Sequence, residues 1–438
     1  MKAILLGVSL LFSPFLAVAQ TQMSLKECVQ YGLSHDLTVQ KQQLELDYTK
    51  AQEKEARSSL YPTINGKVQV QHFLDIPVSL LPGEILGQPG VQIPVKFGTS
   101  DNMTAGLEAQ QILYNHTVML STKAVRAAAV LGKLSVEKAR EQVVYNIAQS
   151  YINLQVLRKQ YGLLELNIDK IKKTLRILQV SIDNGFAKQI DADKLLVAQN
   201  NLETEVQNLR NLDEQLQMAL KFSMNMPLAT ELTLTDSLNT SLLAKRSSVA
   251  SQNIDQKLLL AQKDLLGIQN EVVHSGYYPS AAAFASYQVQ AQRNKVNFYD
   301  TQLPWFRTSV IGLQINVPIF DGFLKKAKIQ QGSIRIKQLD LDAQNLTNAI
   351  NFQQQLAAKK IIRLQSAMVA HDRNIALAQK VVNLTQDQIN GGFATAIELI
   401  NAQSALREAR TNKIKADADI RLAELELIKS EGRIVEEF

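Results

Sequence analysis

Residues 151–186 read YINLQVLRKQYGLLELNIDKIKKTLRILQVSIDNGF. They close a stretch from Asn115 to Ile182 that contains no proline. At about 1.5 Å per residue, a helix of this length would reach roughly 100 Å, so we expect it to pack along other long helices. Its apolar residues recur in steps of three and four, the heptad seam of a coiled coil: Leu154, Leu157, Tyr161, Leu164, Ile168, Ile171, Leu175, Leu178 and Ile182.

The same pattern returns in the second half of the chain. From Phe323 to Asn390 there is again no proline, and the three-four alternation runs through Ile361, Leu364, Met368, His371, Ile375, Ala378, Val382, Thr385 and Ile389. The first stretch ends at Asn184-Gly185-Phe186-Ala187 and the second at Gly391-Gly392-Phe393-Ala394. Two long helices that end in the same turn indicate an internal repeat.

Short alternating segments precede each long helix. Residues 64–71, 103–110, 281–290 and 308–317 alternate apolar and polar side chains. This period of two is typical of strands with one dry and one wet face. Each half therefore has the order helix, two-strand hairpin, very long helix, glycine turn and returning helix. The segment from about Asp75 to Ser100 is rich in proline and glycine and is predicted to be the loop of the first hairpin.

The repeat and the N-terminal segment divide the chain. A largely apolar run follows Met1-Lys2, and Ala17-Val18-Ala19 precedes Gln20, so residues 1–19 are predicted to be a cleavable signal peptide. Residues 20–226 form the first predicted structural repeat, 227–244 a linker and 245–438 the second repeat. Cys28 is the only cysteine. It lies beyond the cleavage site, excludes an internal disulfide and is expected to be a half-buried thiol.

Composition and motifs exclude several classes of protein. The net charge of +6 is spread along 438 residues, and no basic run indicates a nucleic-acid partner. The five histidines are scattered, with no pair at metal-ligand spacing. Neither G-x-S-x-G nor a P-loop occurs. We therefore expect no enzyme, no metal site and no cofactor.

The four predicted strands cannot close a barrel by themselves. If their dry face meets lipid, closure is compulsory, because hydrocarbon satisfies no backbone hydrogen-bonding group. Strands of about ten alternating residues suit an outer-membrane barrel. Copies of the chain must then be pooled: two would supply eight strands and three would supply twelve. The alternative is a small soluble sheet that caps a helical rod.

The chain resembles the TolC-like outer-membrane efflux family. The resemblance rests on Tyr61-Pro62 and Tyr278-Pro279, on residues 312–322 (GLQINVPIFDG) and on the turns at Gly185 and Gly392. It covers essentially the whole mature chain. It implies a mainly α fold with a small β part. In a homotrimer, four strands per chain would build one twelve-stranded β-barrel in the outer membrane, and long antiparallel coiled-coil helices would form a tunnel through the periplasm.

The resemblance also implies a function. Members are passive exit ducts of tripartite efflux or type I secretion systems. A periplasmic adaptor (membrane fusion) protein and an inner-membrane transporter would dock at the helical end, and outer-membrane lipid would surround the strands. Gly185, Phe186, Gly392 and Phe393 resemble the family's adaptor-facing tips. The sequence indicates neither the exported substrate nor the identity of the pump and adaptor.

The family carries a ring of carboxylates at the channel entrance, just after the second glycine turn. Glu398 matches this pattern, whereas Asn401 stands where the family has a second acid. Asp191 occupies the place of Glu398 in the first half. The basic residue that locks the closed state in the best-known members would fall near Ala394 and is absent, so the closing network must differ. The other interpretation of Glu398 is a helix-start acid that complements the helix dipole.

A second class of function stays open, a secreted coiled-coil tether or adhesin without a channel. Its hairpins would be no more than caps on the helices. The repeat favours the duct, because a tether needs neither two matched hairpins nor amphipathic strands at equal positions in each half.

Overall fold

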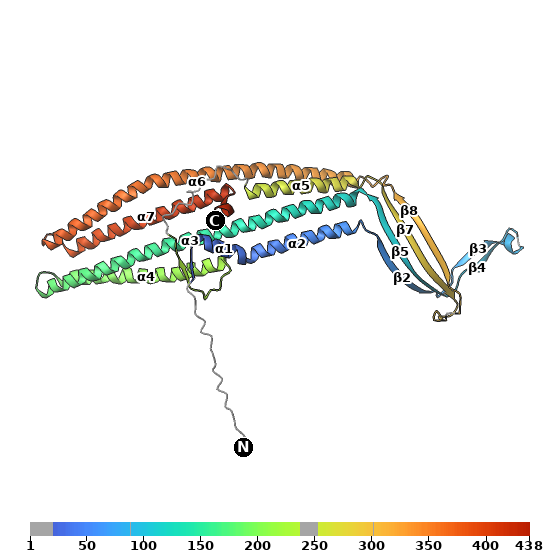
Figure 1. Cartoon of the computed structure of the whole chain (residues 1–438), viewed down its shortest axis with the longest axis horizontal. Helices are drawn as coiled ribbons and strands as arrows, with labels where there is room; N and C mark the ends of the chain where they lie inside the picture. Colours follow the sequence, from blue (N-terminus) through green and yellow to red (C-terminus); the bar gives the residue numbers. More distant parts are fainter. Residues whose placement is uncertain (1–20, 88, 237–252, 301) are drawn as a thin grey trace, which may run out of the picture. The chain divides into compact units, whose positions relative to one another are not determined.

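Two very long helices organise the structure (Figure 1). The computed structural model describes residues 21–87, 89–236, 253–300 and 302–438. The predicted signal peptide and part of the predicted linker lie outside these ranges. Helix α3 (His116–Asp183) has 68 residues and α6 (Leu324–Asn390) has 67, so each extends for about 100 Å. Both long helices are confirmed to within one residue of their predicted ends.

Shorter elements flank each long helix. Before and after α3 these are β1 (Thr21–Met23), α1 (Leu25–His35), α2 (Leu37–Ser58), β2 (Thr63–His72), β3 (Val78–Pro82), the 3-10 helix η1 (Gly83–Leu86), β4 (Gln92–Lys96), β5 (Asp101–Asn115), α4 (Gln189–Ser223) and β6 (Leu232–Leu234). Before and after α6 they are α5 (Ile254–Ser275), β7 (Ser280–Arg293), β8 (Phe306–Asn316), α7 (Ala396–Ser430) and α8 (Ile434–Glu437).

The chain forms two compact units, and each takes residues from both halves of the sequence. The helical unit comprises Met1–Leu44, Lys133–Leu258 and Asp342–Phe438, and the sheet unit comprises Glu45–Gly132 and Leu259–Leu341. The two predicted repeats describe the order of elements along the chain. As a division into domains they stay a prediction.

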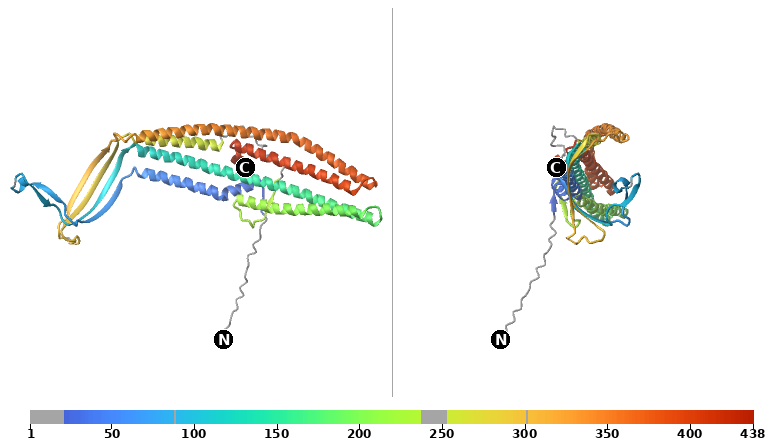
Figure 2. Two further views of the ribbon diagram at one scale, coloured as in Figure 1. Left: turned by 180° about the vertical axis from the view of Figure 1, so that it is seen from behind. Right: turned by 90° about the vertical axis from the view of Figure 1, so that its right-hand side faces the viewer.

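In the helical unit, α3 lies beside α4 and α6 beside α7 (Figure 2). The predicted seams form these contacts. The buried cluster between α3 and α4 consists of Leu164, Ile168, Ile171, Leu195, Leu202 and Val206. The one between α6 and α7 consists of Val382, Leu399, Ala402 and Leu406. Each long helix therefore buries its seam against the helix that follows it in the chain, as the heptad pattern predicts.

A larger core of the helical unit surrounds α1. Ser24 and Glu27 form a capping box at the start of α1, in which the Glu27 carboxylate accepts from the Ser24 backbone N–H at 2.7 Å. Cys28 is fully buried in this core among side chains of α3, α4 and α7, not half-buried as expected. Burial raises the pKa of its thiol to about 12, which makes it an inert packing residue.

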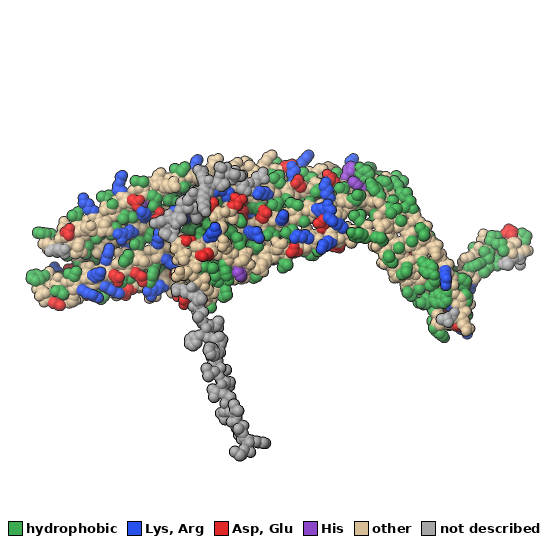
Figure 3. Space-filling view, in the orientation of Figure 1, with side chains coloured by type: hydrophobic (Ala, Val, Ile, Leu, Met, Phe, Trp, Pro, Cys, Tyr) green, Lys and Arg blue, Asp and Glu red, His purple; other side chains and the backbone are tan. Residues whose placement is uncertain are grey.

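The sheet unit contains a four-stranded antiparallel sheet in the order β2-β5-β7-β8. Its register brings the predicted apolar positions onto one face: Ile64 lies opposite Ala109, which lies opposite Ala285, which lies opposite Ile311. Hydrophobic side chains cover the visible surface of these strands (Figure 3). Strands β2 and β8 are the two edges, so the sheet is open within one chain.

The segment predicted to be the loop of the first hairpin contains two strands of its own. β3 and β4 pair antiparallel, with Val78 opposite Lys96, and η1 and glycines with positive φ at positions 87 and 90 connect them. Pro94 lies within β4, which tolerates a residue without an N–H because it has a free edge. The proline and glycine content that indicated a loop therefore marks a turn and an edge strand.

Candidate functional site

The two glycine turns of the helical unit have the same backbone geometry. Gly185 and Gly392 adopt φ of 76° and 78°, the left-handed region that glycine enters without a steric penalty. The Phe186 N–H donates to the Ser181 carbonyl at 2.8 Å, and the Phe393 N–H donates to the Gln388 carbonyl at 2.8 Å. These are Schellman motifs, which end a helix by satisfying its last carbonyls. The sequence similarity of the two turns therefore reflects a shared structural requirement.

The phenylalanine that follows each glycine projects into solvent. Phe186 is 87% exposed and Phe393 is 88% exposed. A helix-ending turn needs the glycine but does not need an exposed aromatic side chain at the next position. Exposed aromatic side chains are typical of contact surfaces, because they bury a large apolar area at low entropic cost. The turn geometry thus accounts for the glycines and leaves the phenylalanines available to a partner.

Glu398 caps the helix that leaves the second turn. The Thr395 backbone N–H donates to the Glu398 carboxylate at 3.0 Å, and the Glu398 N–H donates to the Thr395 hydroxyl at 3.4 Å. Together they form a capping box at the start of α7. Glu398 is nevertheless exposed, so its carboxylate keeps acceptor capacity for a cation. The helix-start role was one of the two interpretations of this residue and does not exclude the other.

Asn401 lies one turn further along α7 on the same exposed side as Glu398. The neighbouring positions face inward: Leu399 and Ala402 contact α6, while Ile400 packs on the α3–α4 cluster. Helix α7 therefore buries two of its sides within the chain and presents Glu398 and Asn401 on a third. The structure brings these two predicted residues together.

Asp191 occupies the first turn of α4, as Glu398 does in α7, but its environment differs. The N-cap of α4 is Lys188, whose side chain makes no capping hydrogen bond. Asp191 is half-buried and complements the helix dipole from the first turn. Within the described part of the chain, neither a hydrogen bond nor an ion pair joins Asp191 to Glu398. One chain therefore does not unite the two predicted acids in a single site.

Sequence reasoning missed an apolar surface near the turns. Ile177 and Val180 on α3, and Ile190 and Val197 on α4, are each more than half exposed. They lie outside the heptad seam, and that is the signal that would have found them: apolar residues at positions where a two-helix coiled coil expects polar ones. Such exposed side chains extend the contact surface beyond Phe186 and Phe393.

Metal and membrane-helix signals are absent from the described residues. No group of three or more histidine, cysteine, aspartate or glutamate side chains there could hold a metal ion. No helix in the same ranges has the length and apolar character needed to cross a membrane.

Comparisons with known proteins connect this geometry to a family. The family model described as "Outer membrane efflux protein" matches residues 29–221 and 242–433. The chain is 20% identical to the outer membrane efflux protein BepC of Brucella suis over 76% of its own length and 72% of that protein. It is 19% identical to the outer membrane protein TolC of Vibrio cholerae, with coverage of 77% and 78%.

The fold comparison agrees with the sequence comparison. The outer membrane protein VceC of Vibrio cholerae superposes with a TM-score of 0.72 at 14% identity, over 93% of this chain and 96% of that chain. The family model covers both halves, including the four-stranded sheet and both glycine turns. The chain therefore belongs to the outer membrane efflux protein family, whose members are channel proteins of the outer membrane that extend into the periplasm.

Proposed function

We propose that three copies of this chain form one passive exit duct through the outer membrane. The observation that carries the proposal is the open sheet of the sheet unit, which has an exposed apolar face and two unpaired edges, β2 and β8. In lipid those edges must pair, because hydrocarbon offers no hydrogen-bonding partner. Pairing β2 of one copy with β8 of the next satisfies both edges at once.

Three copies give a closed barrel of twelve strands. The family resemblance favours three over two, and an even number of antiparallel strands suits outer-membrane barrels. The polar face of the sheet, with Lys67 and Gln69 on β2 and Gln288 on β7, would then line the lumen. The long helices of the three copies would continue the passage into the periplasm. Such a duct needs no cofactor and catalyses no reaction.

The helix turns would form the periplasmic end of the duct. Phe186 and Phe393 supply exposed aromatic contacts for a periplasmic adaptor protein, beside their glycines 185 and 392. An inner-membrane transporter would deliver the substrate through this assembly. Three copies of Glu398, with Asn401 beside it and Asp191 at the equivalent place on α4, would line the entrance. A ring of carboxylates there favours cations and is blocked by multivalent ones.

The experiment is planar-bilayer conductance of the purified mature protein, with light scattering to count the copies. We expect trimers that give cation-preferring steps and are blocked by a trivalent cation. In Glu398→Gln, which can still form a capping box, block should require about ten times more of the trivalent ion. Glu408→Gln is the control, because it removes an equal charge from an exposed site on the same helix.

Each part of the proposal can fail separately. Monomeric or dimeric protein would overturn the trimeric barrel. Trimers whose block is unchanged in Glu398→Gln would keep the duct and remove Glu398 from its entrance. Folded protein that washes off membranes without detergent and never inserts would support the tether instead.

A further inference from the structure

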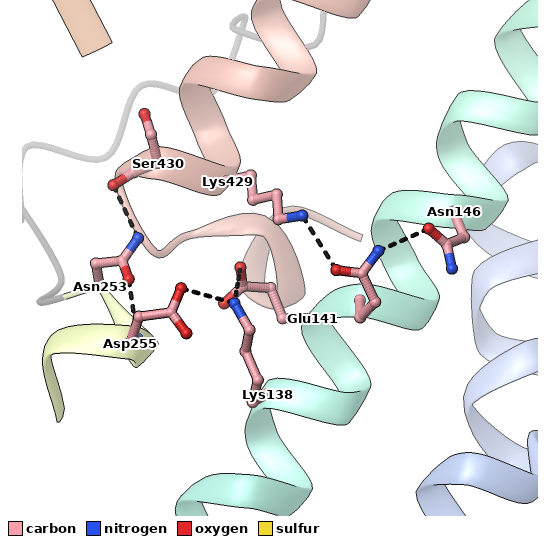
Figure 4. Close-up of polar contacts among 8 residues, drawn as sticks. Lys138, Glu141, Asn146, Asn253, Asp255, Lys429 and Ser430 are labelled. Carbon is pink, nitrogen blue, oxygen red and sulfur yellow. Dashed lines mark hydrogen bonds and ion pairs between the residues drawn. The ribbon is translucent and has the colours of Figure 1, made fainter. Parts of the chain in front are cut away.

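A cavity of about 760 Å³ lies in the helical unit, far along the helices from the glycine turns. Its walls come from α3, α6, the end of α7 and the start of α5. Figure 4 shows lining residues of α3, α5 and α7. Every residue that lines it belongs to the helical unit. The proposed duct function assigns no role to this cavity. It is partly open to solvent, and charged side chains of α3, α5, α6 and α7 line it.

The buried acid of the cavity is Glu141 on α3, which is only 4% exposed. Its Oε1 atom has no hydrogen-bond partner. The Lys138 ammonium lies 3.8 Å from this oxygen, but it is only 2.8 Å from Asp255, to which it donates. Burial raises the pKa of Glu141 above its usual value. A buried carboxylate with an unused oxygen is costly unless something supplies a donor.

The neighbouring polar groups are already committed to one another. Lys429 donates to Gln142 at 3.2 Å, and its ammonium lies 3.9 Å from the centre of the Tyr145 ring. Asn253 donates to the Ser430 carbonyl and accepts from the Asp255 N–H. These contacts leave Oε1 of Glu141 as a buried acceptor with no hydrogen bond, and Figure 4 shows the connected groups around it. Glu426 on α7 also lines the cavity, but its side chain is exposed.

Another wall of the cavity is α6, which combines apolar and basic side chains. Leu346, Ile350 and Ala357 supply apolar surface, and Lys360 and Arg363 follow one and two turns after Ala357. Across the described residues, the side chains of Lys360 and Arg363 take part in no ion pair or hydrogen bond, and Lys359 beside them is equally unpaired. The cavity thus has on α3 a buried acid with one oxygen that accepts no hydrogen bond. On α6 it has an apolar surface, the half-buried Lys360 and the exposed Arg363.

We propose that this cavity binds small zwitterions whose ammonium and carboxylate groups are separated by an apolar chain. The ammonium donates to Oε1 of Glu141, the chain lies along Ile350 and Ala357, and the carboxylate meets Lys360 and Arg363. An anion alone would leave Glu141 without a donor. A cation alone would satisfy Glu141 and leave the basic end unpaired. Only a ligand with both charges pairs with Glu141 and with the α6 cations at the same time.

The test uses three probes of one chain length and the full mature chain in detergent. 8-Aminooctanoate carries both charges, 8-aminooctanamide only the ammonium, and N-acetyl-8-aminooctanoate only the carboxylate. Calorimetry should find 8-aminooctanoate the tightest, with each single-charge probe weaker by about tenfold or more, the value of one charge-assisted hydrogen bond. No binding of 8-aminooctanoate, or equal binding of N-acetyl-8-aminooctanoate, would overturn the proposal.

Two variants test which side chain of the cavity binds each charged group of the ligand. Glu141→Gln should reduce affinity for 8-aminooctanoate about tenfold and leave N-acetyl-8-aminooctanoate unchanged. Lys360→Met, which keeps an apolar stem, should weaken both carboxylate probes and spare 8-aminooctanamide. The controls are Glu137→Gln on α3 and Lys380→Met on α6, which remove the same charges at exposed positions that do not line the cavity. Equal effects of a variant and its control would reject the assigned wall. Trimer formation and conductance, measured on the same samples, are expected to be unaffected, so failure here is distinguishable from failure of the duct.

Discussion

The seam of α3 and the apolar face of the sheet use the same kinds of side chain, but only the seam is covered within one chain. Leu154 on α3 is fully buried, whereas Ile311 on β8 is 88% exposed. Each helical seam meets the next helix of the same chain, whereas large apolar side chains of the sheet face stay exposed. The helical seams are thus completed within one chain, whereas the apolar face of the sheet needs lipid and further copies of the chain.

The largest expected effect tests the buried seam of α3. Leu154→Ala removes a fully buried side chain from the core around α1 and should lower the free energy of unfolding by about 3 kcal/mol. Urea unfolding followed by helical circular dichroism measures it. Leu313→Ala on the exposed sheet face is the matched change and should cost far less in detergent. Equal losses would mean that the sheet face is also covered within the chain.

The second prediction tests the exposed apolar face of the sheet by placing a charged side chain on it. Ile311→Arg places a cation on the apolar face of β8 and should cost about 2 kcal/mol of stability in a bilayer. The measurement is the fraction of protein that inserts into lipid vesicles as a heat-resistant oligomer. Thr308→Arg, on the opposite face of the same strand, should insert normally. Normal insertion of Ile311→Arg would contradict a lipid-facing role for this side of the sheet.

A smaller effect concerns Glu141, a titratable side chain that is buried in the helical unit. Burial raises the pKa of its carboxyl in the folded chain, so the folded state holds the proton at pH values where the unfolded state has lost it. Stability is therefore unaffected below the unfolded pKa and is lost as pH rises through the folded pKa.

Glu141→Gln should match the parent protein at pH 4 and be more stable by about 1 kcal/mol at pH 8. Denaturant midpoints at the two pH values measure this. Glu137→Gln, at an exposed site one turn earlier, should show no such dependence. A constant difference across pH would mean that ionisation of Glu141 is not the cause.

The smallest effect compares the two helix starts that follow the glycine turns. Thr395→Ala removes the capping box of α7 and should cost about 0.5 kcal/mol, with faster hydrogen exchange in its first turn. Lys188→Ala at the start of α4 removes no capping hydrogen bond and should be neutral. If the two substitutions have equal effects, Glu398 does not depend on Thr395 for its position.

The parts of the fold that could be predicted were those in which apolar residues recur at a regular spacing along the sequence. The step of three and four in Leu164, Ile168 and Ile171 predicted the buried side of α3. The period of two predicted which residues of each strand share a face, but the register between strands came only from the structure. The prediction that Cys28 is half-buried was wrong, because the sequence around one cysteine does not reveal how many helices pack against it. The strand pair β3–β4 was also missed. Proline and glycine indicate that the chain turns, but they do not show whether the residues on either side of the turn pair as strands.

The candidate site was predictable only in part. The shared turn predicted the positions of Gly185 and Gly392, and the family resemblance indicated the positions of Glu398 and Asn401. The structure adds that these two residues share one side of α7. The half-buried setting of Asp191 was not predictable, because it depends on how α4 packs. The cavity at Glu141 depends on four helices meeting at one level, which no pattern within a single helix records.

The pairing of β1 with β6 affects the order of events during export of the chain. Thr21 lies opposite Leu232 in a parallel pair, and the Leu25 N–H donates to Asp236 across 211 residues of sequence. The first strand cannot find its partner until more than half of the chain has crossed the inner membrane. Until then β1 lacks the only strand with which it pairs in the described residues.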